Sequence, residues 1–286
     1  MDLHTEQSLA SAAPHDLPLK PPSILSIAGS DPSGGAGILA DVKTIAAHGL
    51  YAQAVPTVLT AQNTLGVYEV LPLDPVFVRM QIETVFADIV PKATKVGMVG
   101  NAAVAQEVAR SLQQVRAHNV VVDPIMVSST GTRLLEQEAI EMVAAKLFPL
   151  AALITPNIPE AETLLETAIE DASSRETAAR RLALRYGCSV LIKGGHDSTG
   201  AADCLAEQTP DNIKIHWFCQ ERIPNADAHG TGCALSSAIA CELALGCPLD
   251  QSVQKAKQYL TSALRHPLGL GRGTSPVNHF WKTSCR

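Results

Sequence analysis

Several features that mark particular classes of protein are scarce in this chain. Aromatic residues make up 4% of its 286 residues, and the net charge is −6 without a long basic run. Both observations argue against the stacking platforms and basic patches of nucleic-acid-binding proteins. No apolar run is long enough to span a membrane. We therefore expect neither a nucleic-acid partner nor a membrane partner.

Paired cysteines and targeting signals are also missing. The seven cysteines form no CxxC pair, and their odd number predicts reduced thiols in a cytoplasmic protein. Residues 1–22 mix alanine, serine, proline and acidic residues. This segment has neither the basic start of a secretion signal nor the arginine content of a transit peptide. We expect it to be a disordered N-terminal tail.

The remaining sequence has the composition and pattern of an α/β protein. The whole chain is 46% hydrophobic and 17% charged, which suits a well-formed core. Short β-branched runs alternate with longer amphipathic ones, so we expect a mainly parallel central sheet with helices on both faces, in a single domain over 23–286. The predicted strands are 23–28, 54–60, 94–99, 120–123, 152–155, 189–193 and 213–218. The predicted helices are 36–48, 75–89, 102–117, 136–148, 159–166, 174–186, 231–245 and 250–265.

Ligands of such sheets bind beyond the carboxyl ends of the strands, and a glycine-rich segment, GSDPSGGAG at 29–37, follows the first predicted strand. It is not a P-loop, because Gly35 and Ala36 stand where lysine and Ser/Thr are required. A dinucleotide fingerprint would need an acidic residue about 20 positions further on, and none is present. Either a glycine-rich turn or a ligand loop fits, and Asp31 in it could hold a substrate hydroxyl or amine.

Polar side chains end the next strands. Gln62 and Asn63 carry amides that donate and accept, as recognition of a heteroaromatic ring requires, although a polar turn is the simpler interpretation. Asp123 ends a buried strand, where it would either organise a metal or water at a phosphate or cap the following loop. Asn157 and Glu160 fit a helix cap, a magnesium site or both. Lys193 either reaches a phosphate or is simply solvated.

The segment HGTGC at 229–233 is the most specific of these motifs. Gly230 and Gly232 flank a predicted helix start, with Cys233 in the first turn. Glycine allows close backbone approach, and a helix N-terminus offers free N–H groups and the positive end of a dipole. Together they predict an anion site, most often for phosphate. A glycine-rich cap without chemistry is the alternative, but the small side chains around Thr231 favour the anion site.

Taken together, these motifs resemble those of the ribokinase superfamily and, within it, of the hydroxymethylpyrimidine/phosphomethylpyrimidine kinases of thiamine biosynthesis. The motifs occur in the same order from about residue 24 to 280. They are GSDPSGGAG at 29–37, TAQNT at 60–64, KVGM at 95–98, VVDPIM at 121–126, TPNIPEAE at 155–162, IKGGH at 192–196, HGTGC at 229–233 and GRGTSPVNHF at 271–280.

The resemblance implies a ribokinase-like fold and a substrate site for a pyrimidine. The ring would stack near Gly29 and Met98, and Gln62 would hydrogen-bond its ring nitrogen and amino group. Asp31 would also belong to the substrate site. The expected activity transfers phosphate from ATP first to the hydroxymethylpyrimidine and then to its monophosphate. Homodimers are common among such kinases, so we expect one here.

The resemblance also implies roles at the phosphates. Asp123 and Glu160 would organise Mg²⁺, helped by Asn157, which together with Lys193 and Gly232 would contact ATP. Lys193 would also neutralise phosphate charge during transfer. The backbone amides of residues 230–233 would form an anion hole for the transferring phosphoryl group. Cys233 stands where most members of the superfamily carry an aspartate as base.

Three other functions remain to be weighed. A pyridoxine or pyridoxal kinase shares the fold, and some enzymes of that kind also carry a cysteine at the position of Cys233. A catalytically silent ligand-binding protein is disfavoured by the presence of Asp123, Glu160 and Cys233 together. An NAD-dependent oxidoreductase is disfavoured by the missing acidic partner of its glycine loop. One departure from the kinase pattern is Ala234, where threonine is expected.

Overall fold

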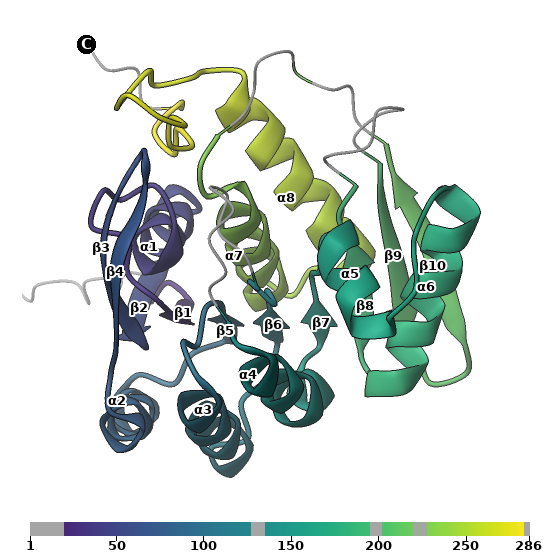
Figure 1. Cartoon of the computed structure of the whole chain (residues 1–286), viewed down its shortest axis with the longest axis horizontal. Helices are drawn as coiled ribbons and strands as arrows, with labels where there is room; N and C mark the ends of the chain where they lie inside the picture. Colours follow the sequence, from purple (N-terminus) through teal and green to yellow (C-terminus); the bar gives the residue numbers. More distant parts are fainter. Residues whose placement is uncertain (1–19, 127–134, 195–201, 220–222, 224–227, 283–286) are drawn as a thin grey trace, which may run out of the picture.

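The structure, a computed structural model, describes residues 20–126, 135–194, 202–219, 223 and 228–282. The tail predicted at 1–22 lies outside these residues except for its last three. Strands of one eight-stranded sheet run in the order β10-β9-β8-β7-β6-β5-β1-β2 (Figure 1). They are β1 Ser23–Ala28, β2 Tyr51–Pro56, β5 Ala93–Val96, β6 Val120–Val122, β7 Leu153–Ile154, β8 Ser189–Ile192, β9 Asp203–Gln208 and β10 Ile213–Phe218.

In this sheet the neighbouring strands β2, β1, β5, β6, β7 and β8 are parallel, and β9 runs antiparallel to β8 and β10. Helices cover both faces, as predicted (Figure 1). One face carries α1 Gly37–Ala47, α7 Thr231–Ala244 and α8 Leu249–Leu264. The other carries α2 Pro75–Asp88, α3 Ala102–Gln114, α4 Gln137–Met142, α5 Ile158–Leu165 and α6 Ala172–Tyr186. None of the helices within the described residues is long and apolar enough to cross a membrane.

Alternation along the strands explains why the sheet has two cores. In β1, Leu25 and Ile27 pack under α2 and α3, whereas Ile24 packs under α1, α7 and α8. Successive side chains of a strand point to opposite faces, so a strand covered on both sides is apolar throughout. All six residues of β1 are buried.

The predicted strand 54–60 is wrong in its middle, because the chain leaves the large sheet there. β2 ends at Pro56, and Thr57 turns away, donating its N–H to Ala28 O at 3.1 Å and its hydroxyl to Met98 O at 2.6 Å. Strands β3 (Val58–Asn63) and β4 (Gly66–Pro72) then form a separate antiparallel hairpin. Strands β4 and β9 were not predicted from the sequence. One helix was predicted over 136–148, where α4 gives way to a π-helical turn, Val143–Leu147, and a 3₁₀ turn, Phe148–Leu150.

A buried ion pair connects the large sheet to a helix on one of its faces. Lys95 on β5 lies 2.9 Å from Asp41 Oδ2 of α1, and neither side chain is exposed. Asp41 also accepts hydrogen bonds from Ser26 of β1 at 2.6 Å and from Ser237 of α7 at 2.8 Å. Burial opposes the charge of Lys95, but the Asp41 carboxylate keeps its pKa above the usual value. The cluster therefore links β1, β5, α1 and α7 beneath the start of α7.

Candidate active site

The start of α7 combines tight backbone packing with free amide groups. Gly230 caps the helix with φ of 87°, and a side chain there would overlap the carbonyl of Gly35, so this position needs glycine. The first intrahelical bond runs from the Ala234 N–H to Gly230 O at 2.9 Å. The N–H groups of the three preceding residues therefore point out of the helix end. The helix start predicted at Thr231 is confirmed.

A carboxylate and an ammonium group face this helix start from the ends of β6 and β8. Lys193 Nζ donates to Asp123 Oδ1 at 2.8 Å, and Thr155 donates to the same oxygen at 3.1 Å. A side-chain carbon at Gly232 would lie 3.3 Å from Asp123 Oδ2 and 3.4 Å from Lys193 Nζ. Burial opposes ionisation of Asp123, but Lys193 and Lys95 hold the pKa of its carboxyl below the usual range. The structure thus brings three predicted site segments together.

Asn157 and Glu160 form a capping box at the start of α5. The Asn157 side chain accepts the Glu160 N–H at 2.8 Å, and Glu160 Oε2 accepts the Asn157 N–H at 2.8 Å. The capping interpretation is therefore confirmed, and it does not exclude a metal role. Burial, opposed by the charge of Lys193 and reinforced by that of Asp123, raises the pKa of Glu160 to about 7.

Cys233 lies buried in the first turn of α7. A helix N-terminus alone would lower a thiol pKa. Here burial is the larger effect and raises the pKa of Cys233 to about 11, although the nearby Lys95 favours the thiolate. The free protein therefore holds a protonated thiol at this position at neutral pH.

The glycine-rich loop after β1 is organised by Asp31. Its Oδ1 accepts from the N–H and hydroxyl of Ser33 at 2.9 and 2.7 Å. Its Oδ2 accepts from the N–H groups of Gly35 and Ala36 at 3.1 and 2.9 Å. Burial disfavours the charge, but hydrogen bonds from His229 and Ser33 lower the pKa of Asp31 to about 2. The predicted contact of Asp31 with substrate stays a prediction; its observed bonds shape the loop and hold His229.

His229 joins this loop to the β3–β4 hairpin. Its Nε2 lies 3.0 Å from Asp31 Oδ2 and 3.0 Å from Gln62 Nε2. From the sequence, His229 was only the first letter of the HGTGC motif, and no role was predicted for it. Asn63, by contrast, accepts the Leu65 N–H at 2.9 Å within the hairpin turn, so the polar-turn interpretation holds for that residue.

Gly29 and Met98 lie side by side where the pyrimidine is expected. A side-chain carbon at Gly29 would lie 3.2 Å from Met98 Sδ. Met98 is buried, and its carbonyl accepts the Thr57 hydroxyl. The pair forms a small apolar surface beside Val58, and its contact with a ring stays a prediction.

A family model described as phosphomethylpyrimidine kinase matches residues 31–278. The chain belongs to the phosphomethylpyrimidine kinase family. It is 45% identical over 259 residues to the thiamine biosynthesis bifunctional protein ThiED of Geobacter sulfurreducens, covering 90% of this chain and 52% of that protein. The chain therefore spans about half the length of that relative.

Solved structures agree with this membership. Phosphomethylpyrimidine kinase from Clostridium difficile is 40% identical, with a TM-score of 0.74 over 85% of this chain and 99% of that one. An ADP complex of Bacillus subtilis pyridoxal kinase is 30% identical, with a TM-score of 0.83 over 92% of this chain and 98% of that one. The phosphomethylpyrimidine kinase family thus shares its ribokinase-like fold with nucleotide-binding pyridoxal kinases.

The acidic residues of this family member suit a magnesium ion that arrives with a nucleotide. Within the described ranges no three histidine, cysteine or acidic side chains converge on one metal position. Mg²⁺ is commonly held by one or two carboxylates together with substrate phosphates and water. Asp123 and Glu160 are two carboxylates of this kind, and the charge of Lys193 acts on both.

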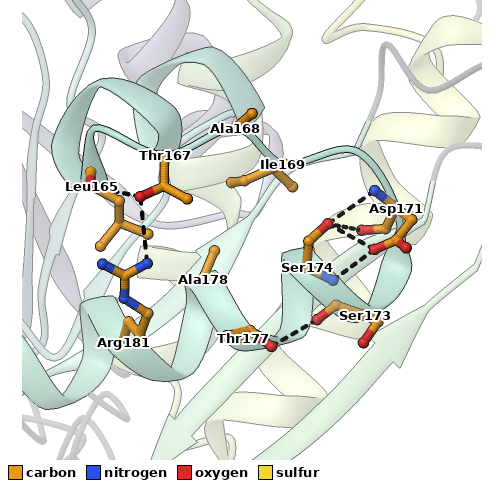
Figure 2. A pocket seen from close by; sticks show the side chains of 10 residues that line it. All are labelled: Leu165, Thr167, Ala168, Ile169, Asp171, Ser173, Ser174, Thr177, Ala178 and Arg181. Atoms are coloured by element: carbon orange, nitrogen blue, oxygen red, sulfur yellow. Dashed lines mark hydrogen bonds between the residues drawn. The ribbon is translucent and has the colours of Figure 1, made fainter.

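A surface pocket of about 320 Å³ lies elsewhere on this kinase, between α5 and α6 (Figure 2). Its lining includes none of the predicted site residues. Asp171 and Ser174 in its wall cap α6 with each other, and Arg181 contacts the Thr167 hydroxyl at 3.5 Å. These bonds stabilise the helix junction, so we assign the pocket no ligand.

Proposed function

We propose that the chain is an ATP- and Mg²⁺-dependent kinase of thiamine diphosphate biosynthesis. Its first substrate is 4-amino-5-hydroxymethyl-2-methylpyrimidine, and its second is the resulting monophosphate. Membership of the family supports the activity. The observation that carries the proposal is the convergence of the α7 start with Asp123 and Lys193, where Gly232 approaches both groups.

Phosphoryl transfer requires positioning and charge stabilisation more than covalent participation of the protein. The N–H groups of Thr231, Gly232 and Cys233 stabilise the negative charge that develops on the transferring group. Lys193, held 2.8 Å from Asp123, is placed to add a positive charge at the same phosphoryl oxygens. A Mg²⁺ ion held by Asp123 and Glu160 would supply further charge neutralisation of the ATP phosphates.

The pyrimidine side of the reaction uses the other wall of the site. Gln62 recognises the ring, Gly29 and Met98 give an apolar surface for its face, and Asn157 supports the nucleotide side. The substrate hydroxyl oxygen bonds to the γ-phosphorus as the bond to ADP breaks. Cys233 then takes the hydroxyl proton, which requires the thiolate at the moment of transfer.

An ADP-release assay with ATP and Mg²⁺ tests this function. We expect turnover of the hydroxymethylpyrimidine and of its monophosphate, with a higher kcat/KM than for pyridoxal or pyridoxine. Preferential turnover of pyridoxal would favour the second candidate, a pyridoxal kinase, which the Bacillus subtilis neighbour supports. Absence of ADP release with all of these alcohols would contradict the proposal and favour a catalytically silent ligand-binding protein.

The metal role predicts a shifted Mg²⁺ requirement. Asp123→Asn and Glu160→Gln keep side-chain size but remove the charge that a hard cation needs. Both variants should need more Mg²⁺ for half-maximal rate, while Glu138→Gln, an exposed residue of α4, should not. Titrating Mg²⁺ at saturating ATP measures this requirement. A lower maximal rate with an unchanged Mg²⁺ requirement would contradict the metal role and favour a capping role alone.

The same carboxylates predict a pH dependence with a definite sign. Because the pKa of Glu160 is raised to about 7, this group is largely protonated below that pH and binds cations weakly there. The Mg²⁺ concentration that the wild type needs for half-maximal rate should therefore decrease as the pH is raised from about 6 to about 8. Glu160→Gln should flatten that trend.

A homodimer is part of the proposal, formed through the β3–β4 hairpin. Within the described residues these two strands pair only with each other, and an isolated two-stranded hairpin is marginal in water. Leu59 and Leu71 lie opposite each other and are 43% and 60% exposed. Tyr68 of β4 and Phe77 in the first turn of α2 are 66% and 54% exposed. A second copy of the chain offers a matching apolar surface through two-fold symmetry.

The dimer prediction has a matched control. Leu71→Glu should shift the protein towards a monomer, because a charge would have to be buried in the interface. Leu184→Glu introduces the same change at a position on α6 that is 72% exposed, and it should leave the mass unchanged. Light scattering during size exclusion measures both. A monomeric wild type would contradict the proposal.

The single-domain organisation over 23–286 and a cytoplasmic location complete the proposal. All six cysteines among the described residues are free thiols, which supports a reducing compartment. Limited proteolysis tests the domain prediction, because one domain should yield one resistant core.

A further inference from the structure

The amide of Gln62 lies between two neighbours whose hydrogen-bonding roles can be deduced. His229 Nε2 lies 3.0 Å from the Gln62 amide and 3.0 Å from Asp31 Oδ2. On the other side, Thr60 Oγ1 lies 3.2 Å from the amide and 2.8 Å from the carbonyl oxygen of Ser30. Of these groups, the Ser30 carbonyl can only accept, and Asp31 can only accept when it is ionised.

The proton on His229 follows from Asp31. Hydrogen bonds outweigh the effect of burial and lower the pKa of Asp31 to about 2, so Asp31 is a carboxylate at neutral pH. His229 Nε2 must then carry a proton to donate to it. A protonated ring nitrogen has no lone pair, so it cannot also accept from the NH₂ group of Gln62.

The proton on Thr60 leads to the same result. A hydroxyl has one proton, and Thr60 gives it to the Ser30 carbonyl at 2.8 Å. It can therefore only accept from Gln62, which requires the NH₂ group on that side. The oxygen and nitrogen of a glutamine amide are assigned from their hydrogen-bond network. A half-turn of the Gln62 amide places its nitrogen at Thr60 and its oxygen at His229, where the Nε2 proton is shared between that oxygen and Asp31 Oδ2. The half-turn therefore removes the contact between two donors at His229.

We infer that His229 and Thr60 are positioning residues that fix the direction of the Gln62 amide and thereby select the substrate. This inference rests on the proposed function. The edge of the fixed amide presents an acceptor on the His229 side and a donor on the Thr60 side. A 4-aminopyrimidine presents the complementary order, with a donor amino group beside an acceptor ring nitrogen.

The direction of the amide also sets the direction of the reacting group. The hydroxymethyl group is attached to the carbon next to the one that bears the amino group, on the side away from the paired ring nitrogen. With the amino group at the His229 side, the hydroxymethyl group lies beyond it. His229 immediately precedes Gly230, the cap of α7, so the reacting oxygen is directed towards the amides of α7. The reversed amide would favour the opposite placement.

An analogue with the reversed hydrogen-bond order tests the inference. The 4-oxo compound 5-hydroxymethyl-2-methylpyrimidin-4-one presents an acceptor at the oxygen and a donor at the adjacent N–H. Calorimetry without ATP compares its binding with that of the 4-amino compound, so the readout does not need turnover. The wild type should prefer the 4-amino compound by on the order of 10²-fold or more, because the oxo compound sets like groups against each other.

Variants then show whether His229 and Thr60 cause that preference. In His229→Leu the amide is released to rotate, and the preference should fall to within about tenfold. His229→Gln restores a donor at the position of Nε2 and should restore much of the preference. Thr60→Val removes the acceptor on the other side without touching α7 and should also weaken the preference, whereas Thr84→Val, exposed on α2, should not.

The outcomes separate this inference from the proposed function. Equal wild-type affinity for the two pyrimidines overturns the inference, whether or not the 4-amino compound is phosphorylated. A preference that survives in both His229→Leu and Thr60→Val, with both affinities reduced in parallel, also overturns it, because His229 and Thr60 would then act only by packing. Failure of the wild type to phosphorylate the 4-amino compound that it binds selectively would overturn the proposed function instead. Melting temperatures identify any variant that has not folded, and the Thr60 variant then decides.

Discussion

Cys233→Ala should lower kcat by ~10²–10⁴-fold with little change in KM, which is the usual range for the loss of a general base. An interaction made only in the transition state lowers kcat and kcat/KM together. Cys233→Asp should retain more activity than Cys233→Ala, because a carboxylate can take the same proton. Cys241→Ala is the control, because Cys241 is buried on the same helix further from the site.

The pH profile separates a catalytic thiol from a structural one. Burial raises the pKa of Cys233 to about 11, so the thiolate fraction grows about tenfold per pH unit above neutrality. If the thiolate is the base, kcat/KM of the wild type should rise over that range, and Cys233→Asp should show a flatter profile. Near-wild-type kcat in Cys233→Ala would instead assign catalysis to the backbone amides of α7.

Lys95→Met should lower the free energy of unfolding by about 3–5 kcal/mol. Removing one partner of a buried ion pair leaves the other as an uncompensated charge, and both side chains of this pair are fully buried. Asp41 would keep its two serine hydroxyls but lose its cation. Urea unfolding followed by circular dichroism measures the change.

Two further variants make that prediction specific. Lys92→Met makes the same substitution at an exposed position just before β5 and should change the unfolding free energy by less than about 0.5 kcal/mol. Adding Asp41→Asn to Lys95→Met should recover part of the loss, because no net charge then remains buried. A Lys95→Met variant as stable as wild type would show that the pair contributes little.

Features set by local sequence were predicted well, and features set by distant contacts were not. The α7 start is encoded within a few residues, since Gly230 and the small residues after it already indicate a helix start. Asp123 and Glu160 follow strands whose apolar runs are visible without a structure. The break at Thr57 is different: seven residues from Ala54 look like one strand, and only the contacts with Ala28 and Met98 divide it.

His229 and Lys95, whose contacts were not predicted, show the same limit. His229 derives its role from Asp31, 198 positions away, so no local pattern indicates that the two meet. Lys95 reads as an ordinary lysine inside an apolar strand until Asp41, 54 positions earlier, lies against it. A lysine in the middle of a buried strand was nevertheless a usable signal, because such a charge requires a partner.

Alternate residues of strand β3 face the site and the outside of the molecule. Thr60 and Gln62 are partly buried towards the site, whereas Leu59, Ala61 and Asn63 are exposed on the outward side. In the proposed dimer, ligand recognition and self-association would share one strand. The affinity for the pyrimidine would then depend on protein concentration, weakening on dilution, while the nucleotide side around Lys193 and Asn157 would be far less affected. Evolution could likewise alter substrate preference from the far side of the strand, through substitutions that never touch the ligand.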